Sequence, residues 1–175
     1  MGNAVSLPNV YNKVEESIHM SNGLTAVFIE VLVISGSMLA TTVREKELVI
    51  WFAEKDQSSV GIGTVGFDID DIPWTIDDFQ NEKQFILGMI SNALNEIGWE
   101  KLDYTPNKDI VTSCLNQFTQ MIKMFEQQHV DIDNYIEWRD CELLDGEPGI
   151  PIGYPKCQKH DIYLTCFGCL LCNDH

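Results

Sequence analysis

The sequence predicts a mainly α-helical protein: a helical bundle with a small β element and a C-terminal zinc-binding module. Three observations lead to this fold class. Apolar residues recur at helical spacing in several long segments before residue 129. A glycine-rich stretch over 58–69 alternates loosely in the manner of a strand. Four of the six cysteines and two of the four histidines lie in the last nineteen residues.

The length and composition indicate a globular protein with a small appended module. The chain has 175 residues, and its hydrophobic content of 45% is enough for a sizeable core. A linker rich in proline and glycine begins at Gly146. We therefore divide the chain into an acidic helical domain, 1–146, and a linker with a Cys/His zinc-binding tail, 147–175.

The net charge of −16 restricts the class of partner. So many carboxylates would repel nucleic-acid phosphates, so we expect no nucleic-acid binding, whereas a basic protein would be attracted. The most apolar stretch, 24–40, contains Glu30 and a Ser-Gly-Ser break, and we expect no membrane span. No secretory signal opens the chain, and thiol-rich motifs without one indicate a reducing cytoplasm.

The first two elements are expected to be helices. Val10, Val14 and Ile18 recur every four residues, which predicts a short helix over 9–20. The next segment, 24–40, is rich in β-branched residues but is much longer than a typical strand. We therefore predict that it forms the central core helix.

A helix and a short strand are expected next. Thr42 and Glu45 form a capping-box pattern that predicts an amphipathic helix over 44–55. The glycine-rich stretch then predicts a turn into a strand ending near Ile69. Its glycines at 61, 63 and 66 fit G-x-G-x-x-G, but no strand-to-helix context accompanies them, so we interpret the segment as a turn rather than a nucleotide site.

Two longer helices complete the predicted bundle. One is expected over 76–97, capped by Thr75 or Asp77 and stopped by Gly98. The other is expected to run from a cap at Asn107 or Asp109 to about residue 128. Its apolar stripe comprises Ile110, Cys114, Leu115, Phe118, Met121, Ile122 and Phe125, which makes Cys114 a core residue.

The tail contains two short motifs suited to metal binding. Cys157 and His160 are three residues apart, and so are Cys169 and Cys172. Three thiolates and one imidazole make a closed tetrahedral zinc site with no position for water, so we expect a structural Zn²⁺. Cys166 and His175 are alternative ligands. A disulfide cluster is the other interpretation of these cysteines.

Two acidic segments are candidate binding surfaces for a basic protein. The first contains Asp68, Asp70, Asp71, Asp77 and Asp78, and the second contains Asp133, Tyr135, Glu137 and Trp138. In the second, the two aromatic residues are candidate interface anchors. The alternatives for the first segment are a solvated surface and a divalent-cation site. The alternative for the second is that Ile136 and Trp138 pack on the bundle while the acidic side chains face water.

Motifs for catalysis are absent from the sequence, since neither a nucleophile elbow nor H-E-x-x-H occurs, and we expect a non-enzymatic protein. In size and charge the whole chain is similar to the immunity proteins of bacterial toxin systems. That resemblance implies binding and neutralisation of a basic toxin such as a nuclease. The alternatives are a phage or host regulator that acts through its zinc module, and a metal-dependent enzyme that uses the Asp68–Asp78 carboxylates.

Overall fold

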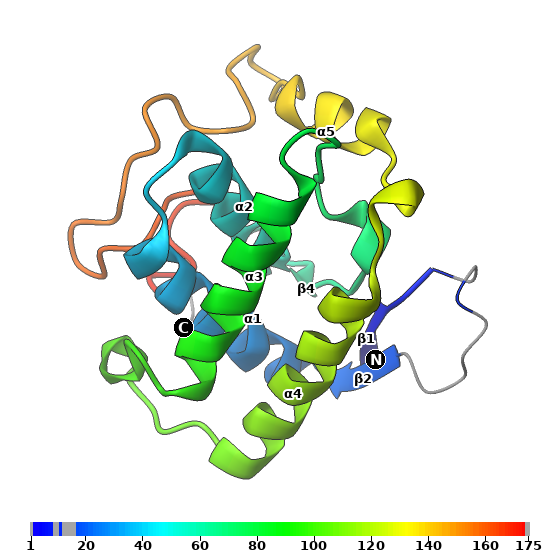
Figure 1. Ribbon diagram of the computed structural model, residues 1–175. Helices are drawn as coiled ribbons and strands as arrows, with labels where there is room; N and C mark the ends of the chain where they lie inside the picture. The colour runs from blue at the N-terminus through cyan, green and yellow to red at the C-terminus, as the bar shows by residue number, and fades with distance from the viewer. Residues whose placement is uncertain (1, 9–10, 12–16, 174–175) are drawn as a thin grey trace.

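The computed structural model describes residues 2–8, 11 and 17–173, and it confirms a helical bundle with a small sheet (Figure 1). The helices in the described part of the chain are α1 Asn22–Leu39, α2 Val43–Ala53, α3 Phe79–Leu94, α4 Lys108–Met124 and α5 Ile132–Arg139.

Helix α1 forms the centre of the bundle and packs against α2, α3 and α4. Ser21 caps it, because its hydroxyl accepts a hydrogen bond from the N–H of Leu24 at 3.1 Å. Every side chain from Phe28 to Ser37 is buried, which confirms the predicted core helix. This helix is long and apolar enough to cross a membrane, but 61% of it is buried inside the fold, as in the core helix of a soluble protein.

Helix α2 begins at the predicted capping box. The hydroxyl of Thr42 accepts from the N–H of Glu45 at 3.2 Å, and the Glu45 carboxylate accepts from the N–H of Thr42 at 3.1 Å. Its second half, Leu48–Ala53, is buried against α1 and the aromatic core. The cap therefore fixes where the chain turns from α1 into α2.

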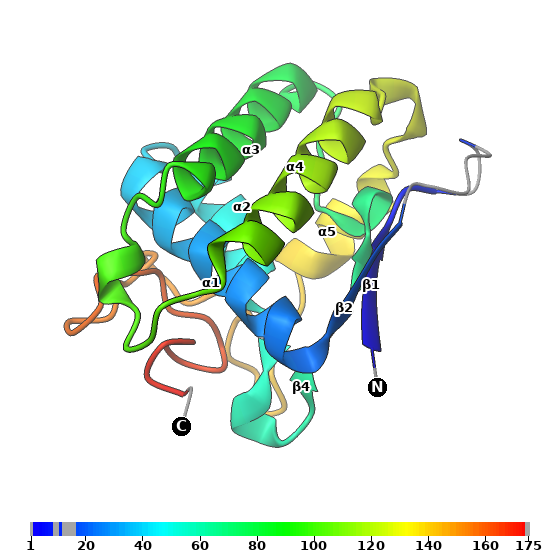
Figure 2. The same ribbon diagram turned by 90° about the horizontal axis from the view of Figure 1, so that it is seen from below.

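The larger sheet has the strand order β2-β1-β5, with strands Gly2–Ser6 (β1), Ser17–Ser21 (β2) and Phe67–Asp68 (β5). Strand β1 lies beside β2 and is antiparallel to it (Figure 2). It is parallel to β5. The predicted helix over 9–20 is wrong at residues 17–20, where Ile18 and Met20 are buried and His19 is exposed in a two-residue alternation. Residues 9–10 and 12–16 of that prediction lie outside the described residues.

The glycine-rich segment forms the expected turn, but two short strands follow it in place of the single predicted one. Strands Asp56–Gln57 (β3) and Gly63–Thr64 (β4) pair antiparallel around the 3₁₀ turn Ser58–Val60 (η2). Gly66 passes so close to β1 that a Cβ there would lie 2.1 Å from the carbonyl oxygen of Ala4. This glycine therefore serves strand packing. A second 3₁₀ turn, Ile69–Asp71 (η3), follows β5.

Helices α3 and α4 are shorter than the sequence predicts. Helix α3 begins after Asp78, rather than Thr75 or Asp77, and it ends at Leu94. The predicted stop, Gly98, lies further on at φ 82°, where it starts the 3₁₀ turn Trp99–Lys101 (η4).

The predicted cap of α4 is confirmed, because the Asn107 side chain accepts from the N–H of Ile110 at 3.3 Å. The helix ends at Met124, before the 3₁₀ turn Gln127–His129 (η5), and not near residue 128. Cys114 is buried as expected, but Ile110 is 48% exposed and does not belong to the buried stripe. Helix α5 follows and was not predicted as a helix.

The tail lies against the C-terminal half of α1. The Lys156 ammonium donates to the carbonyl oxygen of Ser37 at 3.0 Å, and the N–H of Tyr163 donates to the Ser37 hydroxyl at 3.3 Å. Ile162 and Leu170 are buried in the same hydrophobic core as the helices. The contact between tail and α1 positions the two Cys/His motifs. The proposed boundary near residue 146 stays a prediction.

Candidate metal centre and acidic surface

The two tail motifs bring four ligand-type side chains to one point. Cys157, His160, Cys169 and Cys172 each offer a ligand atom, and these atoms all lie within 4.8 Å of one another. His160 Nδ1 lies 3.7, 3.5 and 3.4 Å from the sulfurs of Cys157, Cys169 and Cys172. The sulfurs of Cys157 and Cys172 are 3.7 Å apart.

These separations match a four-coordinate metal ion. Metal–ligand bonds of about 2.3 Å to sulfur and 2.0–2.1 Å to nitrogen, at tetrahedral angles, give about 3.8 Å between sulfurs and about 3.6 Å between sulfur and nitrogen. The observed distances of 3.4–3.7 Å lie close to both values. The donor set and its spacing therefore fit a metal ion held by four protein ligands.

Backbone hydrogen bonds shape the first motif. The N–H of Cys157 donates to the carbonyl oxygen of Ile162, and the N–H of Asp161 donates back to the Cys157 carbonyl, each at 2.8 Å. Asp161 has φ 55°, the left-handed conformation that reverses the chain after His160. The motif is thus a tight turn with both ligands on its inner side.

The second motif is a similar turn. The N–H groups of Cys172 and Asn173 both donate to the carbonyl oxygen of Cys169 at 3.1 Å. It follows a tight reversal in which Thr165 and Gly168 exchange backbone hydrogen bonds, with Gly168 at φ 89°. Only glycine adopts this conformation readily, so Gly168 directs the thiols of Cys169 and Cys172 toward Cys157 and His160.

The electrostatics of the site favour negative charge on sulfur at Cys157. Burial opposes ionisation of this thiol, but N–H groups of His160 and Lys159 donate to it and lower its pKa from 9.0 to about 6. Burial raises the pKa of Cys169 above 9.0, and the neighbouring thiols add to that effect. Three thiolates this close together repel one another, which a bound cation would relieve.

Of the two alternative ligands, Cys166 does not join the cluster. Cys166 lines a separate cleft of about 150 Å³ with Glu54, Trp138 and Cys141. His175 lies outside the described residues. The disulfide interpretation does not fit either, because all six cysteines are free and the nearest sulfurs stand 3.7 Å apart, far beyond a bond of about 2.05 Å.

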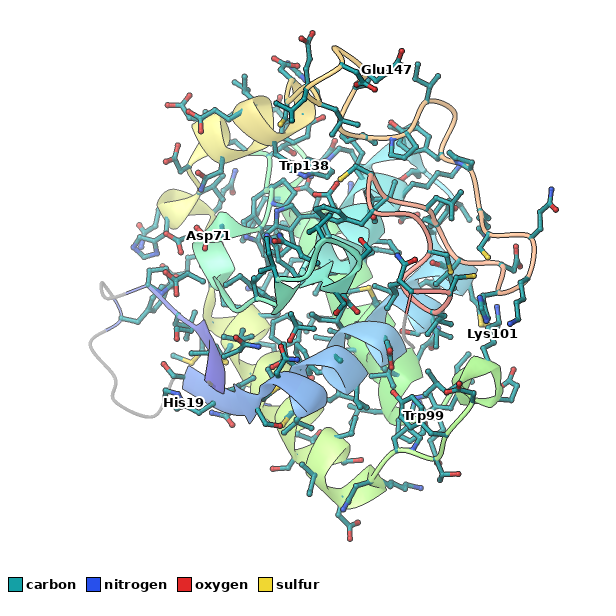
Figure 3. The ribbon with its side chains drawn as sticks, turned by 180° about the vertical axis from the view of Figure 1, so that it is seen from behind. His19, Asp71, Trp99, Lys101, Trp138 and Glu147 are labelled. Atoms are coloured by element: carbon teal, nitrogen blue, oxygen red, sulfur yellow. The ribbon has the colours of Figure 1, made fainter. Side chains whose placement is uncertain are left out.

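A small cleft of about 200 Å³ adjoins the metal centre, and its lining includes Lys101, Tyr104, Lys159 and His160. Lys101 faces the tail in the rear view (Figure 3). The Tyr104 hydroxyl donates to the carboxylate of Glu30, a fully buried side chain of α1. This pairing was not predictable from local sequence, because it joins residues 74 positions apart.

The two acidic segments meet on one face of the molecule. The Asn134 amide donates to the carbonyl oxygen of Asp70, and the Gln127 amide donates to that of Ile76, both at 2.9 Å. Burial and the carboxylates of Asp71, Asp68 and Asp131 raise the pKa of Asp70. We call the carboxylates of these two adjoining segments, Asp68, Asp70, Asp71, Asp77, Asp78, Asp131, Asp133 and Glu137, the acidic surface.

The acidic surface is not arranged as a cation site. Within residues 2–8, 11 and 17–173, the tail cluster is the one group of three or more Cys, His, Asp or Glu side chains that converge closely enough for a metal. The Asp71 carboxylate instead accepts from the N–H of Asp68 at 2.9 Å and caps the η3 turn. Asp77 and Asp78 are exposed.

The two aromatic residues of the second acidic segment face inward. The Tyr135 ring lies 4.4 Å from the Arg44 guanidinium. The indole N–H of Trp138 donates to the Glu54 carboxylate at 2.7 Å, and Figure 3 shows Trp138 beneath α5. Both side chains are half-buried and hold α5 on α2. Their role as interface anchors stays a prediction.

A buried ion network beneath α5 was missed at the level of sequence. Arg44 donates to Glu82 at 2.8 Å and to Glu47 at 3.3 Å, and both carboxylates are almost fully buried. Glu82 also accepts from the N–H and the hydroxyl of Thr75, at 2.8 and 2.6 Å. The i,i+3 spacing of Arg44 and Glu47 offered a signal for one pair, but nothing local linked either residue to Glu82.

Comparison with protein-family models, curated proteins and solved structures finds no match for this chain. The case for a function therefore depends on the metal centre and the acidic surface themselves.

Proposed function

We propose that this protein is a non-enzymatic, cytoplasmic interaction protein that binds a basic protein through its acidic surface. A Zn²⁺ ion held by Cys157, His160, Cys169 and Cys172 would fix the tail to the helical body. Zn²⁺ suits this donor set because thiolate and imidazole are its usual structural ligands. Four protein ligands leave no position for water or substrate, which favours a structural role over a hydrolytic one.

The observation that carries the proposal is the convergence of the two acidic segments. Asp70 and Asp131 are 61 positions apart in the chain, yet they lie close enough for one charge to affect the other. Like charges so placed raise the free energy of the unbound protein, and a cationic partner would lower it. The net charge of −16 adds long-range attraction for the same kind of partner.

A basic nuclease toxin is the partner class that this surface suits best. Such an enzyme carries cationic side chains where it contacts nucleic-acid phosphates. A row of carboxylates can occupy that position and block the active site. A stable interface needs about 800 Å² from each partner, and the whole molecule exposes 8876 Å². This is the activity of an immunity protein.

The test measures binding and nuclease inhibition with a panel of purified, positively charged nuclease toxin domains at low ionic strength. One variant combines Asp133→Asn and Glu137→Gln, two exposed residues of the acidic surface. The matched variant combines Glu100→Gln and Asp103→Asn, which are exposed near η4 and remove the same charge. We expect the first to weaken binding about tenfold and the second by less than about threefold, because close charge pairs contribute more than distant ones.

Two results would reject the proposal. If no toxin domain of the panel binds at low salt, the proposal that this protein binds a basic partner is wrong. Equal weakening by both variants would show a diffuse attraction to net charge without a defined surface. Metal analysis distinguishes the proposed interaction protein from a metal-dependent enzyme. A second, exchangeable divalent ion would favour an enzyme that uses the Asp68–Asp78 carboxylates.

A further inference from the structure

A groove of about 740 Å³ lies between the start of α2 and the side of α3. Its lining includes the apolar side chains of Leu39, Val43, Leu48 and Phe85, together with Gly88, which leaves one wall without a side chain. Val43 is 54% exposed although it is an aliphatic residue. The groove is within the size range of ligand-binding sites.

The rim of the groove is polar and carries more negative than positive charge. Glu45 and Asp78 contribute two carboxylates, whereas the buried carboxylate of Glu82 is paired with the single guanidinium of Arg44. That guanidinium is already bound by Glu82, Glu47 and the carbonyl oxygen of Pro73. An anionic occupant would therefore meet repulsion and no available cation.

The N-terminus of α2 does not change this conclusion. The carboxylate of Glu45 accepts hydrogen bonds from Thr41 and Thr42, and so occupies the place that an anion would take at the helix end. These hydrogen bonds lower the pKa of Glu45 despite the opposing effect of burial, so the carboxylate stays ionised. The occupant is thus expected to combine an apolar surface with positive charge.

We propose that this α2–α3 groove receives the apolar face of a basic amphipathic helix of the protein partner. The assignment rests on the proposed function, because it names the part of the molecule that the basic partner enters. Apolar side chains of the helix would lie over Val43 and Leu39, above the buried Phe85, and flanking lysine or arginine side chains would face Asp78 and Glu45. Asp78 belongs to both the groove rim and the acidic surface, so one partner can cover the two regions together.

A second copy of this chain fits the groove poorly. Two molecules that each carry a charge of −16 repel one another, and the acidic rim would increase that repulsion. A salt-dependent dimer of the wild type that Gly88→Leu converts to a monomer in analytical ultracentrifugation would overturn the proposal.

The experiment fills the groove without changing its charge. Gly88 is the position to change, because a Cβ there meets only Leu39 Cδ2, at 3.3 Å, and alanine or leucine also suits a helix better than glycine. Gly88→Leu would place an isobutyl group in the groove. Ser91→Leu is the matched control, since Ser91 is exposed on the same helix outside the groove lining.

The probe is a fluorescein-labelled helical peptide with leucine on one face and lysine on the other, measured by fluorescence anisotropy at low ionic strength. We expect Gly88→Leu to raise its Kd by at least about tenfold, as for the loss of one buried leucine. Ser91→Leu should change it by less than about twofold. Polylysine, which has no apolar face, should bind both variants like the wild type.

The outcomes separate this inference from the proposed function. If Asp133→Asn with Glu137→Gln weakens binding of the peptide and Gly88→Leu does not, the groove assignment is wrong and the acidic surface stands. If neither changes binding, both are wrong. Gly88→Ala controls for misfolding, because it should keep the wild-type melting temperature. It should also weaken binding less than Gly88→Leu does. An unchanged Kd for both variants would reject the groove assignment.

Discussion

The backbone N–H of Tyr163 donates to the hydroxyl of Ser37, which joins the tail to the end of the central helix across 126 positions of sequence. Tyr163 is 4% exposed, and the side chains beside it enter the same core as the helices. Tyr163 lies in the sequence between the two ligand pairs of the metal centre, Cys157 with His160 and Cys169 with Cys172. Metal binding and tail packing are therefore expected to depend on each other.

Cys169→Ser should release the metal and loosen the tail while α1 to α4 remain helical. Serine is a poor zinc ligand, and the tail alone buries too little to stay ordered. Metal content by elemental analysis, helicity by circular dichroism and hydrogen exchange at residues 157–172 measure the three effects. Cys166→Ser, which lies outside the cluster, should keep the metal. Loss of all helical signal in Cys169→Ser would show that the centre supports the whole fold.

Glu54 should make the protein less stable as the pH rises. Burial raises its pKa from 4.5 to about 7, despite the Trp138 hydrogen bond. A carboxyl whose pKa is higher in the folded state than in the unfolded state stabilises the fold fully at a pH below its unfolded-state pKa. This contribution to the free energy of unfolding is lost as the pH rises through the folded-state pKa. Between pH 4.5 and about 7 the free energy of unfolding of the wild type should therefore fall by up to about 3 kcal/mol relative to that of a variant that stays neutral at this position.

Glu54→Gln supplies that neutral variant. Urea unfolding should show that the free energy of unfolding of Glu54→Gln exceeds that of the wild type by more at pH 8 than at pH 5.5. Glu142→Gln, at an exposed position, should run parallel to the wild type. A constant difference between Glu54→Gln and the wild type across this range would contradict the assignment.

Arg44→Met should destabilise the fold by about 3–5 kcal/mol, because it leaves the buried carboxylates of Glu82 and Glu47 without their cation. Adding Glu82→Gln should restore part of the loss. Breaking the exposed Lys108–Glu96 pair by Lys108→Met should cost less than about 1 kcal/mol. Chemical denaturation of the three variants checks the order. Equal effects of the two single variants would mean that the network is solvated.

Gly66→Ala should weaken the contact between β1 and β5 by about 2 kcal/mol or more, since the added methyl group meets backbone rather than a flexible side chain. Gly23→Ala is the matched change, because no atom lies within 4 Å of its Cβ and α1 favours alanine. Thermal unfolding should rank them in that order. If Gly66→Ala leaves the melting temperature unchanged, β1 can move to make room for the added methyl group.

The helices and the metal ligands were predictable because their signals are local. The length of the apolar segment predicted α1, and the apolar period of α4, the cap at Thr42 and the two ligand pairs of the tail each lie within a short stretch of sequence. The three-stranded sheet was not predictable from local signals, because Val5 pairs with Ile18 on one side and with the distant Phe67 on the other. Helix α5 is polar enough to resemble a loop, and contacts from Arg44 and Glu54 at its aromatic residues hold it in place.

The order of synthesis gives the tail contact a further consequence. Ser37 leaves the ribosome 119 residues before Lys156, which at 5–20 residues per second is a delay of roughly ten seconds. During that interval the end of α1 lacks its contact with the tail, although the helices can already assemble. If Cys157, His160, Cys169 and Cys172 hold Zn²⁺ as proposed, the tail settles on this end only once the ion is captured. Metal supply, rather than helix formation, would then be the last step in the maturation of this protein.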